Sequence, residues 1–106
     1  PFPCRQPVNF DSGEVDFEVL QALCEMDPIR RLEDSRQRAG LEALDLLFID
    51  AGRFDEYNLQ IAARRFVSRL TDLGIGHVYE EVDGGHRGMA WRYGVSLSLI
   101  AEALRT

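Results

Sequence analysis

The sequence predicts an α/β fold in which a helix connects two parallel strands and a further helix follows the second strand. The first observation is a continuous apolar run over about 44–50, broken only by Asp45, which is typical of a strand covered on both faces. The second is an amphipathic helical pattern over about 57–73, and the third is a strand-like segment over about 77–82. A strand, a helix and a strand in this order predict a right-handed crossover, which makes the two strands parallel.

The predicted sheet is too small to stand alone. A chain of 106 residues is one small domain or a piece of a larger one. A two-stranded sheet cannot cover itself and is marginally stable in water, although both strands have the composition of buried strands. We therefore expect residues 1–106 to be a single partial domain, completed by a missing N-terminal portion or by another copy of the chain.

The N-terminal part is predicted to be a loop followed by a helix. Residues 1–13 form an irregular leader that holds three of the four prolines together with Asn9, Asp11 and Gly13. Residues 15–25 then carry apolar side chains at helical spacing behind acidic residues, and acidic residues in a first turn suit the helix dipole. This pattern predicts a helix over about 15–25.

A second helix is predicted over about 28–39. Asp27 precedes Pro28, and this pair is a start signal because Asp caps free N–H groups while Pro is tolerated at the first helical position. Gly40 stands where a C-terminal cap is expected. The apolar stripe is thin, which indicates a largely solvated surface helix.

Two longer helices follow the first predicted strand. The helix over about 57–73 has a continuous apolar stripe with charged residues on the other side. The last helix, over about 94–104, is expected to turn its apolar residues inward. These residues are Leu97, Ile100, Ala101 and Leu104.

The charge balance argues against one class of partner. The chain has 12 basic and 18 acidic residues, which gives a net charge of −6. This balance argues against nucleic-acid binding, since that affinity rests on neutralising phosphates.

No apolar run approaches a membrane span, and no signal-peptide pattern is visible. Cys4 and Cys24 have no metal-ligand or redox spacing. We expect two reduced thiols in a cytoplasmic protein without membrane contact.

One acid and one histidine follow the two predicted strands. Asp55 lies a few residues beyond the first strand, and His86 lies four residues beyond the second. Because parallel strands end at the same edge of a sheet, which is where ligands usually bind, these residues suit an Asp–His pair. The carboxylate would hold the imidazole tautomer while the histidine acts as general base.

Three segments occur in a recognisable order. Residues 50–59 read Asp-Ala-Gly-Arg-Phe-Asp-Glu-Tyr-Asn-Leu, residues 74–77 read Gly-Ile-Gly-His, and residues 83–86 read Asp-Gly-Gly-His. Together they resemble the C-terminal part of the α/β-hydrolase esterases, closest to the esterase D-like and enterochelin-esterase-like enzymes. The tail 91–97, Trp-Arg-Tyr-Gly-Val-Ser-Leu, resembles that family's approach to its final helix. The similarity runs from about Asp27 to the C-terminus, and more loosely over 9–26.

This resemblance implies the C-terminal βαβ-α portion of an α/β-hydrolase fold and a serine carboxylesterase triad with Asp55 as acid and His86 as base. The substrate would be a small ester, and no cofactor or metal is implied. The family's nucleophile lies on an upstream Gly-x-Ser-x-Gly elbow. No serine of this chain has a glycine both two places before it and two places after it. The chain alone is therefore expected to be inactive. Its serines are Ser12, Ser35, Ser68, Ser96 and Ser98.

Other roles are open for the two candidate residues. Asp55 also fits the N-cap of the helix over about 57–73, and Asp50, at the end of the first strand, is a competing acid. His86 also fits an ordinary turn residue beside two glycines.

Further candidates come from neighbouring segments. Trp91 and Tyr93 are candidates for lining an acyl pocket, although aromatic residues more often pack under a terminal helix. Cys24 as a substitute nucleophile has no neighbour in the sequence that would lower its pKa. A metal site is disfavoured because adjacent strand residues point to opposite faces. Its candidate ligands would be Glu80, Glu81, Asp83 and His86.

Two other functions remain open. A non-catalytic module of the same ancestry would cover its strands by forming a homo-oligomer or by binding a partner. A small-ligand binding domain would use the loop edge without chemistry.

Overall fold

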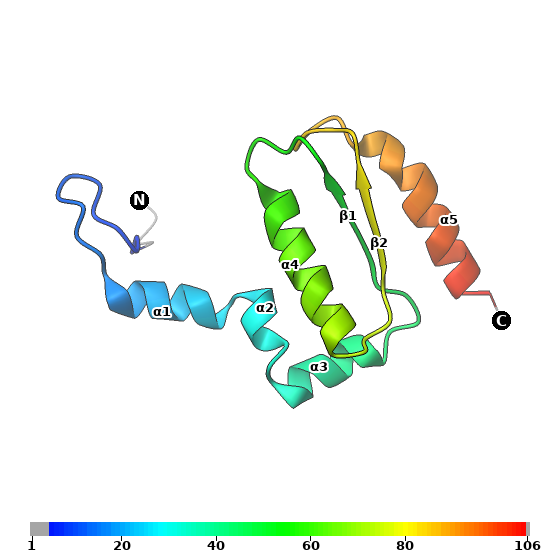
Figure 1. Cartoon of the computed structure of the whole chain (residues 1–106), viewed down its shortest axis with the longest axis horizontal. Helices are drawn as coiled ribbons and strands as arrows, with labels where there is room; N and C mark the ends of the chain where they lie inside the picture. The colour runs from blue at the N-terminus through cyan, green and yellow to red at the C-terminus, as the bar shows by residue number, and fades with distance from the viewer. Residues whose placement is uncertain (1–4, 106) are drawn as a thin grey trace.

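The computed structural model of the chain describes residues 5–105, and within them helices accompany two parallel strands (Figure 1). Figure 1 shows α4 on one side of the two strands and α5 on the other, with α1, α2 and α3 leading up to the first strand. The elements in chain order are α1 (Phe17–Glu25), α2 (Pro28–Arg31), α3 (Ser35–Glu42), β1 (Phe48–Gly52), α4 (Leu59–Asp72), β2 (Val78–Val82), the 3₁₀ helix η1 (Ala90–Arg92) and α5 (Tyr93–Ala103).

The predicted strand–helix–strand unit is confirmed. β1 and β2 pair in parallel, with Phe48 opposite Val78 and Gly52 opposite Val82. β1 begins later than the predicted run over 44–50 and extends to Gly52. β1 begins at Phe48 because its partner strand begins at Val78, the residue opposite Phe48. The first bond between the strands runs from the N–H of Val78 to the carbonyl of Leu47, at 2.9 Å.

The single helix predicted over 28–39 is wrong, because the chain forms two helices there, α2 and α3. Asp34 starts the second one, since its carboxylate accepts the N–H of Arg36 at 2.9 Å. Between the two helices, Leu32 turns into the core and is only 2% exposed. Gly40 lies inside α3 and caps no helix, because α3 continues to Glu42.

The helix ends differ from the predictions by a few residues. α1 begins at Phe17 because the Asp16 carboxylate accepts the N–H of Val19, and α5 begins at Tyr93, directly after η1. α4 begins at Leu59, and its N-cap is Asn58 in the left-handed conformation, with φ of 59°. Asp55 is therefore not the cap of α4.

The described part of the leader is more ordered than predicted. Val8 and Val15 form an antiparallel bridge around a turn in which Gly13 has φ of 75°. The side-chain oxygen of Asn9 accepts the N–H groups of Asp11 and Ser12, which closes the turn. Cys4 lies outside the described residues.

The hydrophobic core lies on the α4 side of the sheet. Leu70 of α4 is fully buried, and Leu32 and Ile75 are 2% and 4% exposed. Partly buried residues from α3, β1, α4 and the positions next to these elements surround them, namely Leu41, Leu47, Ile49, Phe66 and Leu73. The loop before β1 and the turn after α4 therefore converge on one small cluster.

The prediction that α5 turns its apolar residues inward is wrong. Leu97 and Leu104 are 62% and 69% exposed, and Ile100 is 43% exposed. α5 packs chiefly against η1, and these three side chains stay exposed, whereas Val95 and Leu99 are partly buried. The sheet is covered by a core on one face only.

The molecule has more surface than a compact domain of its mass. Its accessible area is 8174 Å², whereas a compact monomer of 12.0 kDa has about 6,000 Å². Its radius of gyration is 17.1 Å, against about 13 Å for a compact chain of this length. Among residues 5–105 no helix combines the length and the apolar character needed to span a membrane.

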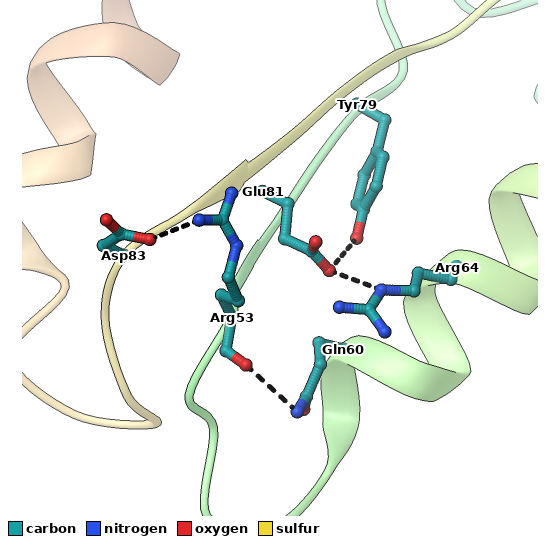
Figure 2. Close-up of polar contacts among 6 residues, drawn as sticks. All are labelled: Arg53, Gln60, Arg64, Tyr79, Glu81 and Asp83. Carbon is teal, nitrogen blue, oxygen red and sulfur yellow. Dashed lines mark hydrogen bonds and ion pairs between the residues drawn. The ribbon is translucent and has the colours of Figure 1, made fainter.

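Polar contacts fix α4 against the sheet (Figure 2). Arg64 of α4 forms an ion pair with Glu81 of β2 at 2.7 Å, and Tyr79 donates its hydroxyl to the same carboxylate at 3.2 Å. Nearer the sheet edge, the Gln60 amide donates to the carbonyl of Arg53 at 3.3 Å. A bidentate contact from Arg69 to Glu33, at 2.7 and 2.9 Å, fixes α4 to the chain between α2 and α3.

These ion pairs predict an acid-sensitive fold. Hydrogen bonding from Arg64 lowers the pKa of Glu81 below its ordinary value of 4.5, and Arg69 lowers that of Glu33 in the same way. A carboxyl group with a lowered folded-state pKa stabilises the fold above its unfolded-state pKa, and this contribution is lost as the pH falls through the folded-state value. The urea midpoint is expected to be nearly constant between about pH 7 and about pH 5 and to fall below about pH 4.5.

Urea titrations across this range measure the effect, and Glu81→Gln provides the comparison. The variant is expected to have a lower midpoint at neutral pH and a shallower acid decline, because it has no carboxylate left to protonate. A decline identical to that of the unsubstituted chain would contradict the role of the Arg64–Glu81 pair.

Candidate active site

The loops that follow β1 and β2 lie side by side because the backbone pairing continues past the strands. The N–H of Arg53 bonds to the carbonyl of Val82 at 2.7 Å, and the N–H of Phe54 bonds to the carbonyl of Gly84 at 2.9 Å. Beside them, the Arg53 guanidinium pairs with the Asp83 carboxylate at 2.6 Å (Figure 2). The two backbone bonds bring together the residues that follow them, from Asp55 and from Gly85 onward.

Asp55 and His86 meet at this edge. Nδ1 of His86 lies 3.1 Å from Oδ2 of Asp55. The carboxylate is buried, with its side chain 7% exposed, while the imidazole is 39% exposed. The other oxygen of Asp55, Oδ1, accepts the N–H of Tyr57 at 2.7 Å. The aspartate is thus fixed by its own loop and presents one oxygen to the histidine.

This geometry selects one form of the neutral imidazole. A carboxylate only accepts hydrogen bonds, so its partner Nδ1 must carry the proton. The second ring nitrogen, Nε2, then has a free lone pair, and no hydrogen bond joins it to the described residues. A partly exposed imidazole in this tautomer can accept a proton at Nε2, and a buried carboxylate at Nδ1 can stabilise the resulting cation.

Two further residues contact His86, and the sequence alone did not single them out. The Tyr57 ring meets the imidazole edge-on, with centroids 4.7 Å apart and an interplanar angle of 75°. Oε2 of Glu56 accepts the backbone N–H of His86 at 3.0 Å, and this bond lowers the pKa of the Glu56 carboxyl group. Glu56 and Tyr57 directly follow Asp55 in the sequence, and this proximity is the sequence feature that could have identified them as neighbours of His86.

Asp50 is not the partner of His86, because its carboxylate accepts a hydrogen bond from Nε of Arg92 at 3.0 Å. Arg92 is 8% exposed and also pairs with Glu80, which lies directly opposite Asp50 in the sheet. One guanidinium thus neutralises two neighbouring carboxylates, and its hydrogen bonds to Glu80 and Asp50 raise the pKa of Arg92.

Glu80 and Glu81 face opposite sides of the sheet, as expected. Glu80 pairs with Arg92, which immediately precedes α5, and Glu81 pairs with Arg64 of α4. Within residues 5–105 there is no group of three or more His, Cys, Asp or Glu side chains arranged to hold a metal ion. Cys24 lies on α1, which packs chiefly against α2 rather than against the two loops.

Two hollows adjoin the imidazole. One has a volume of about 380 Å³ and is lined by residues that include His86, Tyr93, Ser96 and Phe48. The other, about 310 Å³, is lined by the loop residues Glu56, Tyr57, Gly85, His86 and Arg87. A larger hollow of about 550 Å³ lies among residues of the N-terminal turn and contains neither Asp55 nor His86.

The two aromatic candidates for a pocket wall differ in position. Tyr93 lines the larger of the two hollows beside His86. Trp91 is not among the residues that line it. The indole is 58% exposed and lies beneath the Arg92 guanidinium, whose Cζ is 5.2 Å from the ring centroid.

Gly52 is required where the backbone after β2 approaches the end of β1 closely. A Cβ atom at this position would lie 2.4 Å from the carbonyl oxygen of Gly84 and 2.6 Å from that of Gly85. Both are backbone atoms, so a larger residue must push the loops apart. Gly52→Ala is expected to destabilise the fold by about 1–3 kcal/mol and to remove the Nδ1–H signal of His86 from the NMR spectrum.

Gly40→Ala is the matched control for this substitution. Its Cβ would meet nothing within 4 Å, and Gly40 lies inside α3, so alanine is expected to stabilise the chain by about 0.5–1 kcal/mol. Unchanged His86 signals in Gly52→Ala would show that the loops do not depend on their close approach.

No protein-family model matches the chain, and no match was found among curated proteins. The chemistry of the site therefore rests on the contacts of Asp55 and His86.

Proposed function

We propose that this chain is the C-terminal segment of a serine carboxylesterase-like enzyme with the α/β-hydrolase fold, in which Asp55 and His86 are the acid and base of a Ser–His–Asp triad. The observation that carries the proposal is the 3.1 Å contact between the buried Asp55 carboxylate and Nδ1 of His86, at the C-terminal edge of two parallel strands. The chain order of acid and then histidine is also that of α/β-hydrolases.

The proposed reaction assigns one proton path to His86. Nε2 accepts the proton of a serine hydroxyl as the serine oxygen attacks the ester carbonyl carbon, and Asp55 stabilises the imidazolium that forms. His86 then gives this proton to the departing alcohol, which leaves an acyl-enzyme. Water repeats the same steps and releases the carboxylic acid.

The nucleophile and the oxyanion donors belong to an upstream part of the hydrolase under this proposal. The chain contains no Gly-x-Ser-x-Gly elbow. Residues 1–106 alone are therefore expected neither to turn over p-nitrophenyl acetate by this route nor to react with a fluorophosphonate probe.

The acid of the proposed triad is Asp55 rather than Asp50. Asp50 is neutralised by Arg92, and only Asp55 contacts the imidazole.

The test is made on the intact gene product from the source organism. Its mass and peptide map define the full chain, and its labelling by a fluorophosphonate defines the nucleophile. We expect an elbow upstream of this segment, labelling of its serine, and hydrolysis of p-nitrophenyl acetate that the label abolishes. An intact product without such an elbow, or one whose serine is not labelled, would overturn the esterase proposal.

A second candidate function is a non-catalytic module that assembles with another copy of itself. The observation in its favour is the surface of 8174 Å², which exceeds that of a compact monomer by about 2,000 Å², together with the exposed apolar side chains of α5. A buried area of this order on each partner is typical of obligate dimers. Light scattering after size exclusion is expected to give twice the chain mass, and a stable monomer of 12.0 kDa would contradict it.

A further inference from the structure

Glu56 joins the loop after β1 to the backbone of the loop after β2. Its Oε2 accepts the N–H of His86 at 3.0 Å. The same carboxylate lies against Gly85, since a Cβ atom on that residue would be 2.5 Å from Oε1 of Glu56. The side chain therefore contacts the peptide that carries the imidazole, rather than the ring itself.

The histidine loop needs such an anchor because it is rich in glycine. Gly84, Gly85 and Gly88 lie within residues 83–88, and Gly88 has φ of 74°. Glycine backbones are the most flexible, so such a loop loses more conformational entropy on ordering than other sequences. The contact with Asp55 fixes the ring but leaves the main chain of His86 free to rotate about it.

Two hydrogen bonds hold the main chain of the histidine loop, one at Gly84 and one at His86. The carbonyl of Gly84 accepts the N–H of Phe54 at 2.9 Å, and two residues further on the N–H of His86 donates to Glu56. Together these bonds fix both ends of the Gly84–His86 segment relative to the loop that carries Asp55. The bond to Glu56 is the one closest to the imidazole.

We propose that Glu56 is a positioning residue, whose carboxylate fixes the backbone of His86 so that Nδ1 meets Asp55. The role as a positioning residue for catalysis rests on the proposed function, whereas the effect on the imidazole does not. Hydrogen bonds between a carboxylate and a backbone N–H are stronger than neutral ones. Consistent with this contact, the His86 N–H holds the pKa of the Glu56 carboxyl group below its ordinary value of 4.5.

The test compares Glu56→Ala with Glu56→Gln in the chain as it stands. Nitrogen-15 NMR of the His86 ring at about pH 8.5, where an imidazole is neutral, measures the ratio of the Nδ1–H to the Nε2–H tautomer. Glu56→Ala is expected to lower this ratio several-fold and to speed exchange of the His86 amide hydrogen. Glu56→Gln retains a side-chain oxygen that can accept the same N–H, so it is expected to restore most of the ratio.

The two variants separate positioning from charge. Equal effects of Glu56→Ala and Glu56→Gln would overturn the proposal, because the charge alone would then matter. Unchanged tautomer ratio and amide exchange in Glu56→Ala would also overturn it. Asp83→Asn is the matched control, since it removes an exposed carboxylate from the neighbouring loop position and is expected to leave the His86 ring unchanged.

A substitution that leaves Glu56 in place guards against misfolding of Glu56→Ala. Gly85→Ala introduces the Cβ that meets Oε1 of Glu56, and it is expected to lower the tautomer ratio by pushing the carboxylate away from the loop. A normal ratio in Gly85→Ala would contradict the proposal. None of these readouts requires ester hydrolysis, so absence of an upstream serine would overturn the esterase proposal while leaving this result intact.

Discussion

Asp55→Asn is expected to lower kcat of the complete hydrolase by about 10⁴-fold, the loss found when the acid of a serine-protease triad is changed to Asn. The reason is the contact between Oδ2 of Asp55 and Nδ1 of His86. An asparagine amide can turn its NH₂ group toward Nδ1, which places the ring proton on Nε2 and removes the lone pair that must accept the serine proton. Steady-state kinetics with p-nitrophenyl acetate measure the loss.

The control for this substitution is Asp83→Asn. Asp83 follows β2 and is 72% exposed in an ion pair with Arg53, so its loss removes the same charge from the same edge of the sheet. Its kcat is expected to stay within about twofold, since a surface ion pair contributes about 0–1 kcal/mol to stability and this one does not contact the imidazole. Similar losses in both variants would assign the effect to net charge and contradict a triad role for Asp55.

Leu70→Ala is expected to destabilise the fold by about 2–5 kcal/mol, the cost of truncating a buried leucine. Leu70 is 0% exposed, and the described chain has only two other buried apolar side chains in its core, Leu32 and Ile75. The carbonyl of Leu70 also accepts the N–H of Ile75 at 3.0 Å, so the same residue joins the end of α4 to the turn before β2. Urea unfolding followed by circular dichroism measures the change.

Leu104→Ala is the matched substitution at an exposed site. Leu104 is 69% exposed at the end of α5, and surface changes of this kind usually alter the free energy of unfolding by less than about 0.5 kcal/mol. An equal loss of stability in both variants would mean that the apolar surface of α5 is buried in solution. Light scattering would then be expected to show self-association that buries this surface.

The sequence was sufficient to predict the part of the fold that holds the site. Periodicity distinguishes the strands from α4, and parallel pairing follows from their order, so the meeting of Asp55 and His86 at one edge could be predicted without coordinates. The opposite faces of Glu80 and Glu81 also followed, because adjacent residues of a strand alternate between its two sides. These inferences depend only on local pattern and on the geometry of a βαβ unit.

Other features depended on contacts that the sequence does not reveal. The break between α2 and α3 arises because Leu32 turns into the core and Asp34 starts a new helix. The apolar stripe of α5 predicted an inward face, but periodicity identifies a face without identifying what covers it. Asp50 was a competing candidate for the acid, because its partner, Arg92, is 42 residues away in the sequence and no local pattern connects the two.

The continued pairing beyond β1 and β2 has a consequence for how this domain assembles. The bond from Phe54 to Gly84 extends the strand ladder into the loops, so the alignment of the strands determines which residue stands opposite Asp55. A slip of one position would turn every side chain of the shifted strand to the other face and place a different residue against the aspartate. The Asp55–His86 contact therefore reports correct strand alignment, and its NMR signal can serve as a site-specific probe of native folding.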